Sequence, residues 1–302
     1  MKALNDIIIQ IYTETKIYAM SYIIHNDNCI DIFPTIEDES LDLTITSPPY
    51  CIGKAYDIHT TIEGFLEINE PVIKEVYRKT KPGGSICWQV GHHVKDGEII
   101  PLDFIVYDCF RRLCPDAKLR NRIIWHFEHG ANCRKRFSGR HETILWFTKG
   151  KDYYFDLDPV RVKQKYPGKK YYKGSKKGQY SCNPLGKNPG DVWIIPNVKS
   201  NHVEKTEHPC QFPISIAQRL ILSMTPENGT VLDPFMGSGS TGAAAIIENR
   251  NFIGVELDHD YFNIAKSRLE LAENKELLYR EIDKPIYDPK NAGAVGKDPI
   301  ID

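Results

Sequence analysis

Residues 230–241 read TVLDPFMGSGST, and this stretch decides the fold. It begins with Thr230-Val231-Leu232, which is typical of a buried strand, continues through the glycines Gly237 and Gly239, and leads into a helical pattern. In this order of strand, glycine-containing loop and helix, a nucleotide-like ligand can approach the loop closely and accept hydrogen bonds from its backbone amides. The next strand, 252–256, ends at Glu256, 19 residues after Gly237. At this spacing a carboxylate accepts hydrogen bonds from ribose hydroxyls, so the unit suits an adenosine.

A tight structural turn is the alternative interpretation of this loop. Dinucleotide binding is disfavoured, because the third glycine of Gly-x-Gly-x-x-Gly is absent, although Gly242 lies nearby, and because Asp233-Pro234 precedes the loop.

Strands and helices alternate on both sides of the 230–256 unit. The apolar patterns predict strands at 22–24, 41–46, 85–90, 122–127, 142–148, 230–232 and 252–256, and helices at 67–80, 104–113, 215–224, 240–249 and 261–269. The motif Lys81-Pro82-Gly83-Gly84 is expected to stop the first of these helices. This alternation predicts an α/β fold with a doubly wound, mostly parallel sheet.

The chain is long enough for one catalytic domain that carries an insert. It has 302 residues, of which 41% are hydrophobic and 26% charged. We expect the catalytic and cofactor-binding domain at 22–150 and 206–272. Gly, Pro, Asn, Tyr and Lys dominate 151–205, which is expected to be an irregular insert. Residues 1–21 and 273–302 are expected to be terminal extensions.

Composition narrows the class of protein. No apolar run reaches 18 residues, and the N-terminal stretch mixes charged with apolar residues, so neither a membrane span nor a secretory signal is expected. The eight cysteines include no Cys-x-x-Cys pair, so we expect reduced thiols and no metal site. The net charge of −1 gives no global signal for nucleic acid, so DNA affinity must come from local clusters.

A second loop, Thr46-Ser47-Pro48-Pro49-Tyr50, follows the strand 41–46. Its two prolines fix the backbone and remove two amide donors, which leaves the carbonyls of Ser47 and Pro48 free for a ligand that carries donors. An amino group is such a ligand. The Ser47 side chain adds an acceptor, and the Tyr50 ring offers a surface on which a flat base can stack once it has left the duplex. A proline-rich turn with a half-buried tyrosine is the alternative.

Taken together, the two loops resemble the family of DNA amino-methyltransferases, which modify cytosine at N-4 or adenine at N-6. The resemblance runs from about Tyr22 to Leu269. In the family's beta-class order the Ser/Asp-Pro-Pro-Tyr loop comes first, the recognition region follows, and Asp-Pro-Phe-x-Gly-x-Gly comes last, as it does here. Further matches are His141 to Lys149, Gly190 to Pro196 and Glu207 to Pro213, although Phe212 stands where the family usually has lysine.

The resemblance implies the sheet of an S-adenosylmethionine-dependent methyltransferase and a site for that cofactor. Its cofactor-binding residues would be Asp27, Asp233, Pro234, Phe235, Gly237, Gly239, Thr241, Glu256 and Asp258. Ser47, Pro48, Pro49 and Tyr50 would be the catalytic loop, and the insert 151–205 would be the target-recognition region. The amino nitrogen of a base is a poor nucleophile, so acceptors on its hydrogens and correct positioning would supply most of the catalysis. Direct transfer follows, with no metal.

Basic residues suited to phosphate contacts gather in two segments. They are Arg134, Lys135, Arg136 and Arg140 in the first, and Lys163, Lys165, Lys169, Lys170, Lys173, Lys176 and Lys177 in the second, where tyrosines are interleaved. A solvated flexible loop is the alternative for the second segment. Double-stranded DNA is the expected partner, and a homodimer and a cognate restriction endonuclease acting on the same site are two further candidates. We expect a cytoplasmic protein of bacterial or phage origin.

Serine at position 47 favours cytosine N-4, because the adenine enzymes more often have Asp or Asn there, and adenine N-6 is the alternative. A non-catalytic nucleic-acid-binding module that retains the fold is an alternative from another class. Pro209-Cys210-Gln211 raises a further rival, because a Pro-Cys-Gln loop carries the nucleophile of enzymes that methylate carbon-5 of cytosine. Its position before the cofactor loop and the absence of a Glu-Asn-Val partner disfavour that reaction.

Overall fold

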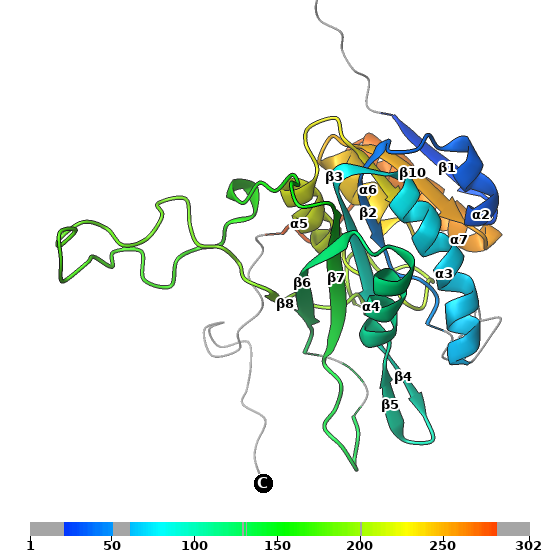
Figure 1. Ribbon diagram of the computed structural model, residues 1–302, viewed down its shortest axis with the longest axis horizontal. Helices are drawn as coiled ribbons and strands as arrows, with labels where there is room; N and C mark the ends of the chain where they lie inside the picture. The colour runs from blue at the N-terminus through cyan, green and yellow to red at the C-terminus, as the bar shows by residue number, and fades with distance from the viewer. Residues whose placement is uncertain (1–20, 51–60, 129, 131, 200, 283–302) are drawn as a thin grey trace, which may run out of the picture.

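The computed structural model describes residues 21–50, 61–128, 130, 132–199 and 201–282. Figure 1 shows a twisted central sheet flanked by helices, with an irregular arm and two shorter projections leaving it. The strands of the main sheet are, in spatial order, β1 (Tyr22–Asn26), β10 (Asn251–Glu256), β9 (Thr230–Asp233), β2 (Leu41–Thr46), β3 (Thr80–Val90), β7 (His141–Lys149), β6 (Ala117–His126) and β8 (Val192–Ile194).

Most neighbouring strands in this sheet are parallel. The five strands from β1 to β3 all run in one direction, and β6 is parallel to β8, whereas β7 is antiparallel to both of its neighbours. Parallel strands place their carboxyl ends at one edge of the sheet, where ligands of open α/β sheets bind. The predicted α/β fold with a mostly parallel sheet is confirmed.

Helices cover both faces of the sheet. One face carries α2 (Cys29–Ile32), α3 (Ile62–Lys79) and α4 (Leu102–Leu113), and the other carries α5 (Ile214–Met224), α6 (Ser240–Ile247) and α7 (His259–Glu273). Alternate residues of a strand point to opposite faces. On β7, Ile144 and Trp146 therefore pack with α5 to α7, while Leu145 and Phe147 pack with α2 to α4. Among the described residues, none of the helices has the length and apolar character needed to span a bilayer.

Several predicted boundaries were wrong, and the start of β3 is one of them. The first long helix ends at Lys79, as the Lys81 to Gly84 motif predicts, but this motif also belongs to β3, which begins at Thr80 and not at Ser85. A side chain at Gly84 would lie 3.0 Å from the Leu41 carbonyl oxygen. Glycine therefore lets β3 run close against β2, and the pairing shifts register there.

Three strands were missing from the predictions. The strands β4 (His92–Lys95) and β5 (Glu98–Pro101) form a hairpin whose turn residues, Asp96 and Gly97, both have positive φ. Asp-Gly is the strongest short turn signal in a sequence, so this hairpin could have been found. The strand β8 lies within the predicted insert 151–205, yet it pairs with β6 at the edge of the main sheet. The sheet thus includes part of that insert.

The arm begins and ends next to this edge. Its base is closed where Val162 pairs with Lys187, and a second isolated bridge joins Lys170 to Tyr180. Between these bridges the chain has turns and bends but no regular strand among its described residues. In Figure 1 the arm, drawn in green, extends away from the sheet on the side of α5 and β8.

Candidate functional site

The two loops predicted to carry the chemistry lie side by side. Strands β2 and β9 are parallel neighbours, with Leu43 opposite Val231 and Thr44 opposite Leu232. Both strands end at the same edge of the sheet, so the loop 47–50 that follows β2 meets the loop 234–239 that follows β9. Residues separated by almost two hundred positions in sequence are in this way brought to one site.

A buried hydrogen-bonded cluster joins these loops. The carboxylate of Asp233 accepts hydrogen bonds from the Thr46 hydroxyl (2.8 Å), the Thr241 hydroxyl (2.7 Å) and the Phe235 amide (3.2 Å). Asp233 and Thr241 have no exposed surface and do not line the cavity described below. In this conformation the two side chains, which were predicted to bind the cofactor, lie outside the cavity and fix the positions of both loops.

Burial raises the pKa of Asp233 to about 7, although its three donors oppose the shift. A raised carboxyl pKa means that the folded state prefers the neutral acid. The stabilisation that the neutral acid contributes is complete below the unfolded-state pKa of 3.8. It is lost as the pH rises through the folded-state pKa of about 7. The charged carboxylate therefore destabilises the folded state at neutral pH.

We accordingly expect Asp233→Asn, which is uncharged at every pH, to change the pH dependence of stability. The free energy of unfolding of the wild type should fall relative to that of the variant between pH 4 and 7, by up to about 1.4 kcal/mol per pH unit. Urea unfolding at four pH values measures this difference. A difference that stays constant across this range would show that the carboxyl does not titrate there.

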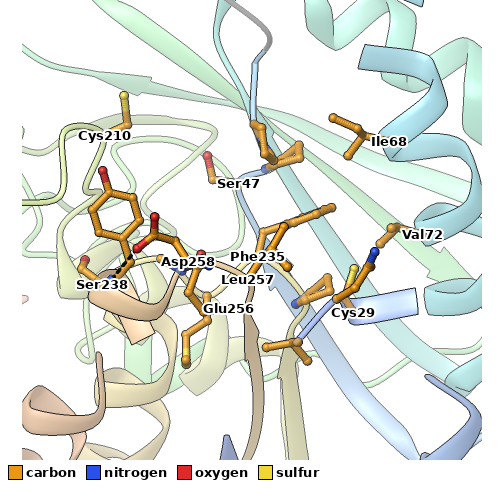
Figure 2. Close-up of a pocket in the computed structure, with 18 of the residues that line it drawn as sticks. Cys29, Ser47, Ile68, Val72, Cys210, Phe235, Ser238, Glu256, Leu257 and Asp258 are labelled. Carbon is orange, nitrogen blue, oxygen red and sulfur yellow. Dashed lines mark hydrogen bonds between the residues drawn. The ribbon is translucent and has the colours of Figure 1, made fainter. Parts of the chain in front are cut away.

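One cavity of about 700 Å³ lies above the cluster. It receives residues from both loops, from the carboxyl ends of β1 and β10 and from the middle of α3. Figure 2 shows Ser47 and Cys210 on one side of Phe235, and Cys29 and Val72 on another. Ten of the predicted catalytic and cofactor-binding residues line it: Asp27, Ser47, Pro48, Pro49, Tyr50, Pro234, Phe235, Gly237, Glu256 and Asp258.

Glu256 lies on the floor of the cavity, and its carboxylate is fixed by backbone amides. One oxygen accepts a hydrogen bond from Gly237 N (2.7 Å), and the other accepts one from Asp258 N (2.9 Å). Burial raises the pKa of Glu256. Asp258 caps α7 by accepting from Asp260 N and Tyr261 N. A carboxylate oxygen has two lone pairs, so Glu256 can accept further bonds from a ligand.

The two glycines of the loop have different roles. Gly237 has a φ of +53° and lines the cavity, and a side chain there would meet the His208 ring at 3.0 Å. Gly239 also has positive φ, but it lies outside the cavity, at the N-terminus of α6, where an added carbon would be 3.0 Å from Ala265 Cβ. Gly237 therefore opens the cavity, whereas Gly239 allows α6 and α7 to pack closely.

His208 and Tyr261 form a wall of the cavity that the sequence reasoning missed. Their rings make an edge contact with centroids 4.5 Å apart, and burial lowers the pKa of His208 to about 4. His208 is therefore neutral at physiological pH. It belongs to the predicted match Glu207 to Pro213, but only the fold shows that this turn approaches Gly237.

The catalytic loop is held by a buried polar network. The hydroxyl groups of Ser47 and Tyr50 lie 3.2 Å apart, and Tyr50 donates to Glu142 (3.1 Å), which also accepts from the Gln89 side-chain amide. Burial raises the pKa of both Tyr50 and Glu142. Glu142 was part of a predicted family match without a role. A charged residue at the start of an apolar strand is the signal that could have identified it.

The predicted DNA-binding residues lie in two separate places. The seven lysines of the second segment are exposed along the arm, where Lys165, Lys170 and Lys173 lie over tyrosine rings. The first segment lies in the loop between β6 and β7, which leaves the same edge of the sheet as the catalytic loop. Arg134 and Lys135 are exposed there, whereas Arg136 and Arg140 are partly buried.

Comparisons with known proteins agree with this arrangement. A family profile described as DNA methylase matches residues 41–267. The type II methyltransferase M.BglII from Bacillus subtilis is 48% identical over 243 residues, which is 80% of this chain and 67% of that protein. The PvuII DNA methyltransferase (cytosine-N4-specific) has a TM-score of 0.66 over 85% of this chain and 93% of its own, and its 20% identity shows the fold alone.

A complex of M1.HpyAVI with S-adenosylmethionine has a TM-score of 0.56 at 25% identity, covering 83% of this chain and all of that one. The matched profile spans the loops at 47–50 and 233–239 and the strands that place them. The resemblance inferred from the sequence is therefore confirmed. This chain belongs to the family of S-adenosylmethionine-dependent DNA methyltransferases that modify cytosine at N-4 or adenine at N-6.

Proposed function

We propose that this protein methylates the exocyclic amino group of a base flipped out of double-stranded DNA, and that the base is cytosine, modified at N-4. The observation that carries the proposal is that the loops 47–50 and 234–238 line one cavity. A methyl donor bound against one loop would lie next to an amino group bound against the other. The adjacency supplies the positioning on which this reaction depends.

The cavity residues fit S-adenosylmethionine on the side of Glu256. The carboxylates of Glu256 and Asp258 suit ribose hydroxyls and amino groups, and Phe235 offers an apolar surface for a flat ring. Gly237 lacks the side chain that would fill this space. A volume of about 700 Å³ falls within the usual range for a small-molecule site. When bound, this cofactor supplies an electrophilic methyl group on a sulfonium.

The residues of the catalytic loop act on the base. The carbonyls of Ser47 and Pro48 and the Ser47 hydroxyl are the acceptors for the two hydrogens of the amino group, which orients its lone pair. The Tyr50 ring is the stacking surface, and Glu142 holds it through its hydroxyl. These groups remove the conjugation of the amino nitrogen with its ring without forming a covalent bond to the base.

The cytosine assignment rests on Ser47. Its hydroxyl is a short acceptor, whereas the Asp or Asn of most adenine enzymes carries a longer side chain. Adenine N-6 is the second candidate, because a carboxylate, an amide oxygen and a hydroxyl all serve as acceptors. The test is to incubate the protein with plasmid DNA and labelled cofactor, digest the DNA to nucleosides and identify the product by mass spectrometry. N4-methylcytosine supports the assignment, whereas N6-methyladenine overturns it and keeps the site.

Methylation of cytosine at carbon-5 would instead require Cys210 as a nucleophile. Cys210 borders the cavity, but in Figure 2 its sulfur atom points away from the residues around Glu256. We expect Cys210→Ala to retain activity within about threefold, because no step proposed above uses a thiol. Initial rates of methyl incorporation measure this. Complete loss in a variant with an unchanged melting temperature would revive the carbon-5 reaction.

The arm carries the proposed contacts with DNA phosphates. Its exposed lysines are available to the duplex, and their neighbouring tyrosines can pack on sugars or bases. The arm would serve as the target-recognition insert, in a cytoplasmic enzyme of a bacterium or phage. The homodimer and the cognate endonuclease remain predictions from the sequence. A non-catalytic binding module is not supported, because such a module needs neither loop.

A further inference from the structure

We propose that Phe137 enters the DNA stack and fills the space left by the flipped base. This inference rests on the proposed function and adds a residue to it. Phe137 is 100% exposed, the largest exposed fraction of any bulky hydrophobic residue that the structure describes. An aromatic side chain gains by leaving water, so burial of this ring in a partner would be favourable.

The loop around Phe137 is built to present it. The backbone N–H of Cys133 donates to the Ser138 hydroxyl (3.0 Å), which closes the tip on itself. At the base of the loop, Arg140 donates to Asn132 Oδ1 (2.9 Å) and to its neighbouring carbonyl at Gly139 (2.9 Å). Arg140, one of the residues predicted to bind DNA, therefore braces the loop in this conformation.

The loop also packs close to the β4–β5 hairpin. A side chain at Gly139 would lie 3.0 Å from His92 Cε1, so the loop backbone passes close to the start of β4. Figure 1 shows the β6–β7 loop and the β4–β5 hairpin projecting from the same end of the sheet. Glycine thus allows two projections to support each other next to the site.

The basic residues beside Phe137 favour DNA as its partner. Phe137 follows Arg134, Lys135 and Arg136 directly, and Arg134 and Lys135 are exposed. Cations beside an apolar tip match the chemistry of a duplex, in which phosphates flank a stack of flat bases. Apolar side chains set among Arg and Lys enter base steps in this way and partly unstack them.

The β6–β7 loop places Phe137 close to the catalytic loop. Phe127 N donates to Arg140 O (2.9 Å), and His126 pairs with His141, so the loop joins the ends of β6 and β7 at the catalytic edge. Glu142, which holds Tyr50, lies five residues after Phe137. A chain of five residues spans at most about 18 Å. Phe137 therefore lies within a few base-pair steps of the base that Tyr50 would receive.

Flipping a base costs unstacking and unpairing energy, and a side chain that fills the gap offsets part of that cost. Phe137→Ala should therefore slow methylation of a fully paired duplex by roughly tenfold to 100-fold. The same variant should methylate a duplex with an abasic position opposite the target base within about threefold of wild type, because that base is already unpaired. Phe137→Trp retains a wedge and should stay near wild type on both duplexes.

The test uses a 30-base-pair duplex that carries the site mapped by sequencing plasmid methylated by the wild type, and a copy that differs only in the abasic position. Ile23→Ala is the matched control, because Ile23 is 55% exposed on β1, at the opposite edge of the sheet from β8. This control should have the wild-type rate on both duplexes. S-adenosylmethionine affinity, measured by calorimetry, should be the same in all four proteins.

Several outcomes would overturn the inference. Equal rates of Phe137→Ala and wild type on the paired duplex would show that no wedge is needed, and equal losses on both duplexes would show a different role. Sedimentation in which a wild-type dimer becomes a monomer in Phe137→Ala would assign this tip to a second copy of the chain. If the wild type methylates no DNA, the proposed function fails, which is a different result from each of these.

Discussion

Replacing Gly237 with valine is expected to weaken S-adenosylmethionine binding by at least about 30-fold, which corresponds to roughly 2 kcal/mol. Gly237 has a φ of +53°, a conformation that costs a β-branched residue about 1–3 kcal/mol. Its side chain would also approach the partly buried His208 ring and fill space in the cavity. Isothermal calorimetry with the cofactor measures the change.

Gly150→Val is the matched control for that substitution. Gly150 also has positive φ, at +94°, but nothing lies within 4 Å of an added side-chain carbon, and the residue follows β7 at the end away from the cavity. It should lower the melting temperature without changing cofactor affinity. Wild-type affinity in a folded Gly237→Val variant would mean that the cofactor binds elsewhere.

Tyr50→Ala is expected to reduce kcat/KM for DNA by about 5-fold to 150-fold, while cofactor affinity stays unchanged. Stacking of a base on an aromatic ring contributes about 1–3 kcal/mol, and alanine removes the ring that would receive the flipped base. The ring lines the cavity beside Ser47, on the other loop from Gly237. Initial rates on duplex DNA, combined with calorimetry, separate an effect on the base from an effect on the cofactor.

Tyr50→Phe keeps the ring and removes only the hydroxyl that donates to Glu142. It should lose less activity than Tyr50→Ala, by no more than about fivefold, which is the effect of one ordinary hydrogen bond. If phenylalanine were as damaging as alanine, the hydroxyl and not the ring would carry the function. An unchanged rate for Tyr50→Ala would remove Tyr50 from the site altogether.

The sequence was most informative where several local signals predict the same structure. The strand, glycine loop and helix from Thr230 onwards were predicted correctly, because apolar strand, turn and helix signals agree with one another there. The Asp96-Gly97 hairpin carried an equally local signal that the apolar patterns around it did not reveal. By contrast, the pairing of β8 with β6 depends on a contact between distant segments, which periodicity does not encode.

The same distinction applies to the candidate site. Glu256 and Gly237 were found from their spacing along one βαβ unit, and they do line the cavity. Asp233 and Thr241 belong to the same motif, but the fold turns their side chains beneath the loops, where they bond each other and Thr46. A motif therefore identifies which residues matter, whereas their placement decides whether each one touches the ligand or supports a residue that does.

The central claim is that one cavity holds the methyl donor and the flipped base against adjoining loops. A crystal structure of the protein with a non-reactive S-adenosylmethionine analogue and duplex DNA carrying the methylated site tests it most directly. The account predicts the adenosine portion beside Phe235 and Glu256, and the amino group of an extrahelical base within hydrogen-bonding distance of Ser47 and the Pro48 carbonyl. An analogue bound in another cavity, or a target base that remains outside the 47–50 loop, would contradict it.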